Sequence, residues 1–138
     1  MAAPASFAAA LISYVVLPFF FNPLREQSTY WGSEFLFLSI GYVLGGPRPD
    51  ELKFTFEFGL PVVAAVAGVI LWVRAGRGAA AARFVCAAAA FAALTLGYQQ
   101  HPGDWLVGFY AADAALAVAT IASAAAFVRR PASRIADR

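Results

Sequence analysis

Apolar residues occur in long runs along this chain, separated by short polar or glycine-containing segments. A helix that crosses a bilayer needs about 20 mainly apolar residues, and four of the runs reach or approach that length. The predicted spans are residues 5–22, 55–73, 79–98 and 105–128. Short turns separate the last three runs, so neighbouring helices must be antiparallel. We therefore predict an all-α fold, an integral membrane four-helix bundle.

A fifth apolar run, residues 33–46, lies between the first two predicted spans. It begins near Glu34, ends in a Gly-Gly-Pro sequence, and is shorter than a spanning helix needs to be. We therefore predict a short interfacial or re-entrant helix on the outer side of the membrane. The alternative is a fifth span, since a run that began at Tyr30 would just reach the minimum length.

Basic residues gather near two of the predicted span ends. Arg74, Arg77 and Arg83 surround the turn between the second and third spans, and four more arginines lie within residues 129–138. Cytoplasmic segments of membrane proteins carry an excess of Lys and Arg. We therefore predict one transmembrane domain over residues 1–128 and a basic cytoplasmic tail over residues 129–138. The expected location is the cell inner membrane, which the chain crosses several times.

Composition supports the same class of protein. Apolar residues make up 62% of the chain and charged residues 13%, with a mean hydropathy of +0.70. Soluble domains are nearer half apolar and a quarter charged, so the excess must face lipid or other membrane helices. The net charge of +2 comes from residues at segment ends, without interleaved aromatic residues. This pattern argues against nucleic-acid binding and makes the lipid bilayer the expected partner.

Motifs with a known chemistry are missing from the sequence. It has one cysteine, Cys86, and one histidine, His101, which argues against disulfide chemistry, bis-histidine haem and histidine-rich metal sites. It also lacks the common hydrolase, metalloprotease and phosphate-binding signatures. We therefore expect no catalytic residue, metal or cofactor, although a membrane enzyme is not excluded.

Ionisable residues inside a span are costly and are functional candidates by default. Asp113 lies within the last predicted span among alanines, and Tyr110 lies one turn before it on the same face. Glu57, Tyr98 and His101 all map to the outer end of the bundle. These five residues could form a proton site or a small polar binding site. In the competing interpretation, each has a structural explanation.

In that interpretation, Asp113 accepts a hydrogen bond from Tyr98 or Tyr14 and only fixes helix packing. Glu57 is then a solvated carboxylate near the lipid headgroups, and His101 is an ordinary loop residue preceding Pro102. The sequence alone leaves both interpretations open.

The order of these features resembles an uncharacterised family of small four-helix bacterial membrane proteins. The similar parts are Glu57-Phe58-Gly59 at the start of the second span, Gly97 and Tyr98 followed by His101, and Tyr110 three residues before Asp113. The resemblance implies a four-helix architecture with an amphipathic segment after the first span. It implies no activity, because that family has none assigned.

Three functions fit these observations. The first is a non-enzymatic accessory or scaffold subunit, forming a homo-oligomer or part of a larger membrane complex. The second is a small oligomeric proton-coupled carrier that uses Asp113 as its titrating carboxylate, with Glu57 as a second candidate. The third is a membrane enzyme that acts on a lipid or isoprenoid through the outer acidic residues.

Overall fold

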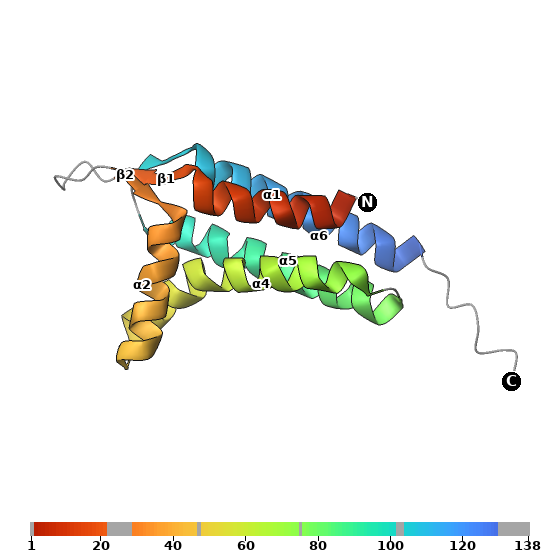
Figure 1. The fold of residues 1–138 in the computed structure, drawn as a ribbon, viewed down its shortest axis with the longest axis horizontal. Helices are drawn as coiled ribbons and strands as arrows, with labels where there is room; N and C mark the ends of the chain where they lie inside the picture. The colour runs from red at the N-terminus through yellow and green to blue at the C-terminus, as the bar shows by residue number, and fades with distance from the viewer. Residues whose placement is uncertain (1, 22–28, 47, 75, 102–103, 130–138) are drawn as a thin grey trace, which may run out of the picture.

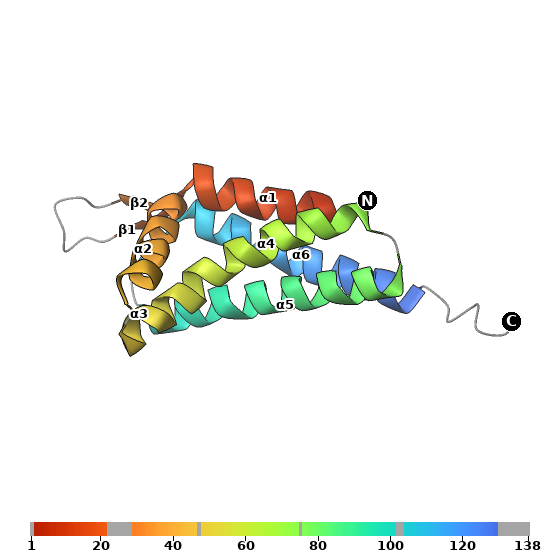
Figure 2. The same cartoon turned by 60° about the horizontal axis from the view of Figure 1, so that its bottom comes forward.

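Four helices lie side by side within the described residues of the computed structural model, which are 2–21, 29–46, 48–74, 76–101 and 104–129 (Figure 1). They are α1 (Ala2–Val16), α4 (Leu60–Ile70), α5 (Arg77–Gln100) and α6 (Val107–Arg129). Helix α1 packs against α6 and α4, and α5 packs against the same two helices from the other side (Figure 2). The fold is mostly helical, as predicted.

Three helical stretches within the described residues are long and apolar enough to cross a membrane. They are Pro49–Ile70, Arg77–Gln100 and Val107–Val128, and they contain the predicted spans 55–73, 79–98 and 105–128 except for a few terminal residues. The last two are rich in alanine, whose small side chain lets neighbouring backbones approach closely. The chain therefore has the helices of a membrane-spanning protein.

The stretch Pro49–Ile70 begins earlier than its apolar pattern indicates. It joins α3 (Pro49–Phe54), a π-helical turn η1 (Thr55–Gly59) and α4, and a 3₁₀ turn η2 (Leu71–Val73) follows. The backbone N–H of Arg48 donates to Glu51 Oε2 at 2.8 Å, and proline occupies the favoured first helical position. Residues 49–54, which lie before the predicted span 55–73, are therefore helical as well.

The first predicted span, residues 5–22, is not helical throughout. Helix α1 ends at Val16, and strand β1 (Pro18–Phe21) follows; residue 22 lies outside the described residues. Proline disfavours the helical conformation in the residue before it, here Leu17, and the run of phenylalanines after it suits a strand. The predicted helix is therefore too long at its C-terminal end.

The all-α prediction also missed a small sheet. Strands β2 (Thr29–Trp31), β1 and β3 (Asp104–Trp105) pair antiparallel in that order within the described residues, with β1 in the middle. Phe19 of β1 is fully buried beneath this sheet, and its ring contacts those of Tyr14, Trp105 and Phe109. The sheet thus ties the end of α1 to the start of α6.

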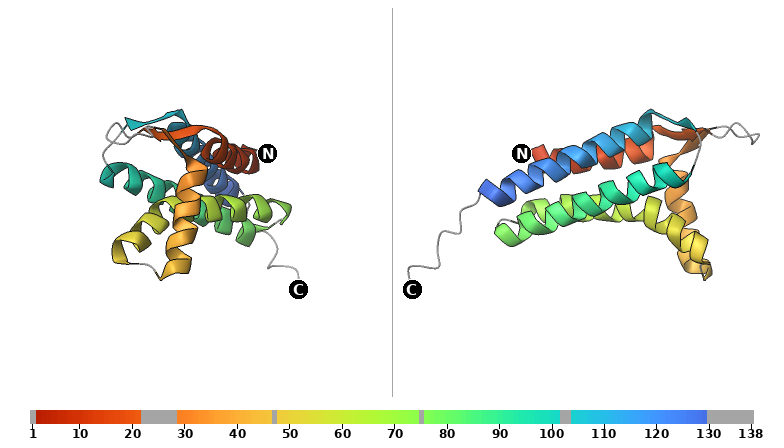
Figure 3. Two further views of the ribbon diagram at one scale, coloured as in Figure 1. Left: turned by 60° about the vertical axis from the view of Figure 1, so that its left-hand side comes forward. Right: turned by 180° about the vertical axis from the view of Figure 1, so that it is seen from behind.

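Helix α2 (Gly32–Gly45) matches the short helix predicted over residues 33–46, and it runs across the end of the four helices (Figures 1 and 3). The backbone N–H of Trp31 donates to Glu34 Oε2 at 2.7 Å, which caps its first turn. The helix ends at Gly45, and the next residue, Gly46, has a φ of 80°, in the left-handed region that favours glycine. Helix α2 and the sheet together form a cap over this end.

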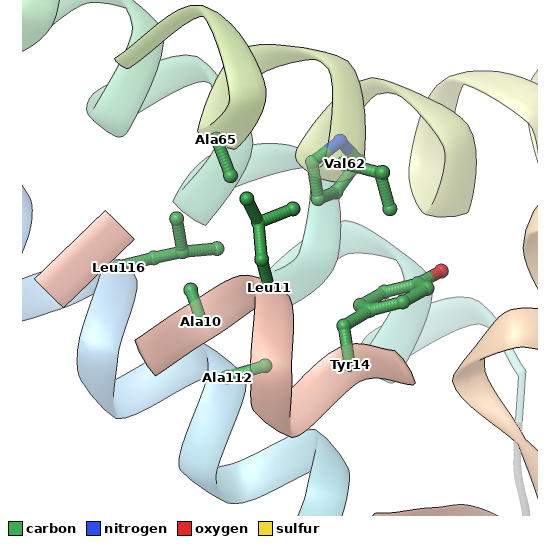
Figure 4. A pocket seen from close by; sticks show the side chains of 8 residues that line it. Ala10, Leu11, Tyr14, Val62, Ala65, Ala112 and Leu116 are labelled. Carbon is green, nitrogen blue, oxygen red and sulfur yellow. The ribbon is translucent and has the colours of Figure 1, made fainter. Parts of the chain in front are cut away.

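Between α1, α4 and α6 the interior is apolar and closely packed. Leu11 and Tyr14 of α1 point toward Val62 and Ala65 of α4 (Figure 4). Buried alanines, Ala10 and Ala112 among them, lie where α1 meets α6. A gap of about 10 Å³ remains there, which is room for no more than about one water molecule. Helix α1 is shorter than α5 and α6, and this packing holds it in place.

Candidate functional site at the capped end

Glu57 lies on the π-helical turn η1, inside an otherwise α-helical stretch. The N–H of Leu60 bonds to the carbonyl of Thr55, five residues back, which widens the turn. Pro61 follows directly, and in a regular α-helix its ring would clash with the carbonyl of Glu57, four residues before it. The wider turn accommodates this ring. Single π-turns are rare and occur frequently at functional sites.

The carboxylate of Glu57 is paired with the imidazole of His101. Glu57 Oε2 and His101 Nε2 are 2.8 Å apart, and the two side chains are 2% and 42% exposed, respectively. His101 directly follows α5, and its backbone N–H bonds to the carbonyl of Gly97. A buried carboxylate is thus joined to an imidazole that reaches the surface.

Gly97 lets α5 approach η1 closely enough for this pair to form. A Cβ atom at position 97 would lie 2.8 Å from Phe58 Cζ and 3.4 Å from the Cβ of Glu57. The first distance is shorter than real Cβ contacts allow, so a larger residue would displace the ring of Phe58 or the helix itself. His101 lies one turn beyond Gly97, directly after the end of α5.

Aromatic rings surround the pair. The imidazole of His101 lies 5.5 Å from the ring of Phe58 and 6.0 Å from that of Phe54. The ring of Trp105 also stacks on that of Phe58, with centroids 5.8 Å apart. These rings help to keep water away from the glutamate, and a carboxyl group in such surroundings needs its hydrogen bond.

A second buried hydrogen bond joins α1 to the same turn. The hydroxyl of Tyr14 donates to the carbonyl oxygen of Phe58 at 2.7 Å, and Tyr14 is 2% exposed. Backbone carbonyls have two acceptor positions, so this oxygen can serve both a side chain and the helix. The π-turn is therefore held by α1 through Tyr14 and by α5 through His101.

The chemistry available to the pair is proton binding and exchange. A glutamate with an imidazolium and a glutamic acid with a neutral imidazole differ by the position of one proton, and both states keep the hydrogen bond. Nδ1 of His101 has no partner within the described part of the chain, and the half-exposed ring gives it access to the surface. The pair thus joins a buried carboxylate to an imidazole at the surface, which is the geometry that a proton-exchange site needs.

Asp113, the predicted centre of the site, is not connected to this pair by any hydrogen bond among the described residues. It lies on α6, six residues or roughly 9 Å beyond the start of the helix. Its Oδ1 is buried and has no hydrogen-bond partner among the residues described. The bond expected from Tyr98 or Tyr14 is not formed there, since the hydroxyl of Tyr14 bonds to Phe58 instead.

The two remaining candidates, Tyr98 and Tyr110, lie together at the outer surface of α5 and α6. Their ring centroids are 6.5 Å apart, and Tyr98 also stacks on Phe109 at 5.6 Å. Both tyrosines are about half exposed. The structure thus divides the predicted site in two: Glu57 pairs with His101, while Tyr98 and Tyr110 lie near each other on the α5–α6 face that carries Asp113.

The prediction that Glu57 is a solvated interfacial carboxylate is wrong, since its side chain is buried and bonded. The residues that sequence reasoning missed are the supports of the pair. Tyr14 is a lone phenol in an apolar run, and no local pattern connects it to Phe58. Pro61 was the available signal, because a proline four residues after Glu57 disturbs the helix at that residue.

The described side chains do not form a metal site. Within the described part of the chain, no three side chains of His, Cys, Asp or Glu come together in a way that could hold a metal ion. The pair of Glu57 and His101 supplies two such groups only.

Searches against family models, curated proteins and solved structures found no match, so the site is defined by the geometry of this chain alone.

Proposed function

We propose that this chain is a four-span inner-membrane protein that acts as an accessory or scaffold subunit, in a homo-oligomer or a larger membrane complex. The fourth span is α1 together with β1. The 15 residues of α1 extend roughly 22 Å, and the four residues of β1 add roughly 13 Å. Their sum exceeds the hydrocarbon thickness of about 30 Å.

The pairing of β1 on both sides supports this span. Backbone N–H and C=O groups that face lipid must be hydrogen-bonded within the protein. Strand β1 lies between β2 and β3 and pairs with both. In this proposal α2 does not cross but lies along the outer surface, in keeping with its course across the end of the helices.

The proposed orientation follows from the distribution of arginine. The end of α4, the start of α5 and the end of α6 lie together at the end opposite α2 (Figure 1). Arg74 and Arg77 belong to that end, and the basic residues 130–138 follow α6 but lie outside the described residues. The positive-inside rule assigns this end to the cytoplasm, with α2 outside.

The observation that carries the subunit proposal is the position of Asp113. A carboxyl group within a span needs a partner. Its Oδ1 has none among the described residues, whereas Glu57 and Tyr14 bond within the chain. Asp113 is only half buried, on the α5–α6 face where Tyr98 and Tyr110 are exposed. A neighbouring chain can supply the missing donor and cover the tyrosines.

Photocrosslinking in native membranes tests this proposal. A benzophenone amino acid replaces Tyr110 or Ala114 on α6, and Ile70 on α4 serves as the exposed control. We expect adducts to another protein chain from the two α6 positions and not from Ile70. The substitution Asp113→Leu should remove them. Mass spectrometry then identifies the partner as a second copy or a different protein. Adducts to lipid alone from both α6 positions would contradict the proposal.

We propose proton-coupled transport as the second function, and the Glu57–His101 pair favours it. A buried carboxylate with a surface-reaching imidazole is a suitable entry point for a proton. Infrared difference spectra between acidic and alkaline buffers should show a carboxyl band that Glu57→Gln removes. Proteoliposomes should also take up protons, and the same variant should abolish the uptake. Identical spectra and uptake in variant and wild type would exclude this function for Glu57.

A further inference from the structure

An apolar groove of about 470 Å³ lies between α2 and the helical stretch Pro49–Ile70. One wall comes from α2, including Ile40, Val43 and Leu44, and the other includes Phe56 and Val63. All five of these side chains are between 47% and 82% exposed. The groove lies on the side of the π-turn away from α5, since Phe56 lines it while the neighbouring Glu57 bonds to His101.

The groove offers almost nothing to a polar ligand. Its lining includes two hydroxyl side chains, Ser39 and Thr55. Ser39 donates to the carbonyl of Phe35 at 2.8 Å, and Thr55 donates to the carbonyl of Glu51 at 2.9 Å. Both hydroxyl hydrogens are therefore already used within the helices, and the occupant must be apolar along its whole buried length.

We propose that this groove binds an acyl chain of a phospholipid from the outer leaflet. The proposal rests on the membrane location and orientation given above and not on the subunit function. The Val63 wall continues along α4 into Val66 and Ile70, which are also exposed. This surface faces hydrocarbon in the proposed orientation, so a chain can enter the groove from the bilayer without crossing water.

The size and lining of the groove suit a single acyl chain. Ligand sites typically measure about 300–1,000 Å³, so the groove is large enough for a small or slender ligand. An acyl chain is slender and flexible and carries no polar group along its length, so it meets the apolar lining without leaving a polar atom unpaired.

Photoreactive phospholipid provides the test. The full chain is reconstituted into vesicles that contain phosphatidylglycerol or phosphatidylcholine with a diazirine in one acyl chain. After illumination, the adducts are mapped by mass spectrometry. We expect adducts at Ile40, Val43 and Val63 to exceed those at Ile70 and Ile121 several-fold with either headgroup, although these five residues have comparable exposure.

A matched pair of variants makes the test specific. Val63→Trp fills the groove and should reduce adducts at Ile40 and Val43 several-fold. Ile70→Trp adds the same ring at an equally exposed site on the same helix and should change nothing there. Equal thermal unfolding midpoints establish that both variants fold.

Three outcomes would overturn the inference. Equal labelling at groove and control positions would mean that only ordinary surrounding lipid contacts the protein. A disulfide between two copies through Ile40→Cys, in a chain whose native cysteine is replaced by alanine, would assign the groove to a dimer. A lack of adducts at every position would refute the membrane location itself, and the acyl-chain site with it.

Discussion

Replacing Gly97 with alanine tests the close approach of α5 to the π-turn. The added Cβ would lie 2.8 Å from Phe58 Cζ, so the ring or the helix must move. Overpacking of this kind costs about 1–3 kcal/mol. A shift of α5 would also pull His101 from Glu57, and a hydrogen bond of this kind contributes on the order of 1 kcal/mol. We therefore expect Gly97→Ala to destabilise the fold by about 1–3 kcal/mol or slightly more.

Gly78 supplies the control in the same helix. A Cβ at position 78 meets nothing within 4 Å, so Gly78→Ala makes the same chemical change without a clash. Alanine is the better helix former by no more than about 1 kcal/mol, and this variant should be neutral or slightly stabilised. Reversible unfolding in mixed micelles, followed by tryptophan fluorescence, gives both free energies.

A double-mutant cycle then locates the cause. Phe58→Leu removes the ring that the new Cβ would meet, so it should relieve part of the cost of Gly97→Ala. We expect a coupling energy of at least about 0.5 kcal/mol between the two positions. Equal stability of Gly97→Ala and Gly78→Ala, or strict additivity with Phe58→Leu, would refute the reasoning from close packing.

The remaining predictions concern the pair and the topology. His101→Ala leaves the buried Glu57 without its hydrogen-bond partner and should cost about 1–3 kcal/mol, whereas His101→Gln keeps a group that can bond to the carboxyl and should cost less; equal costs in the same unfolding assay would argue against the pair. A reporter fused to Arg138 should be active only in its cytoplasmic form, because basic segments stay inside; activity of the external form would reverse the orientation. Single cysteines at Gln27 and Asp50, in a chain without the native cysteine, should both react with an impermeant reagent added outside. Reaction of only one would mean that α2 crosses the membrane.

Length and hydropathy sufficed to predict the helices of residues 79–98 and 105–128, because a long apolar run has few alternatives to a helix. Length and hydropathy gave the wrong structure for residues 18–21, which were predicted as helix and form a strand. There, Pro18 ends the helix, and the segment is fixed by pairing with residues 29–31 and 104–105, which are distant in the sequence. Strand formation depends on such neighbours more than on local preference, so no local pattern indicated the sheet.

The candidate site was predicted as a region and not as a set of bonds. Charge and hydropathy placed Glu57 and His101 at one end of the bundle, and the structure pairs them. The expected bond from Tyr14 or Tyr98 to Asp113 is not formed in the described part of the chain. Tyr14 bonds instead to the carbonyl of Phe58 in the π-turn, and such a local change of helix type depends on packing that sequence spacing does not encode.

The middle position of β1 has a consequence for biosynthesis. Its neighbour β2 leaves the ribosome soon after it, but β3 belongs to the connection between α5 and α6 and arrives far later. Until then, one edge of β1 has unpaired backbone groups at the membrane surface or within it, where they are costly. A chain that terminates after α5 would keep that edge open to other strands, which favours aggregation. The connection between α5 and α6 must therefore be made before a new chain can complete its sheet.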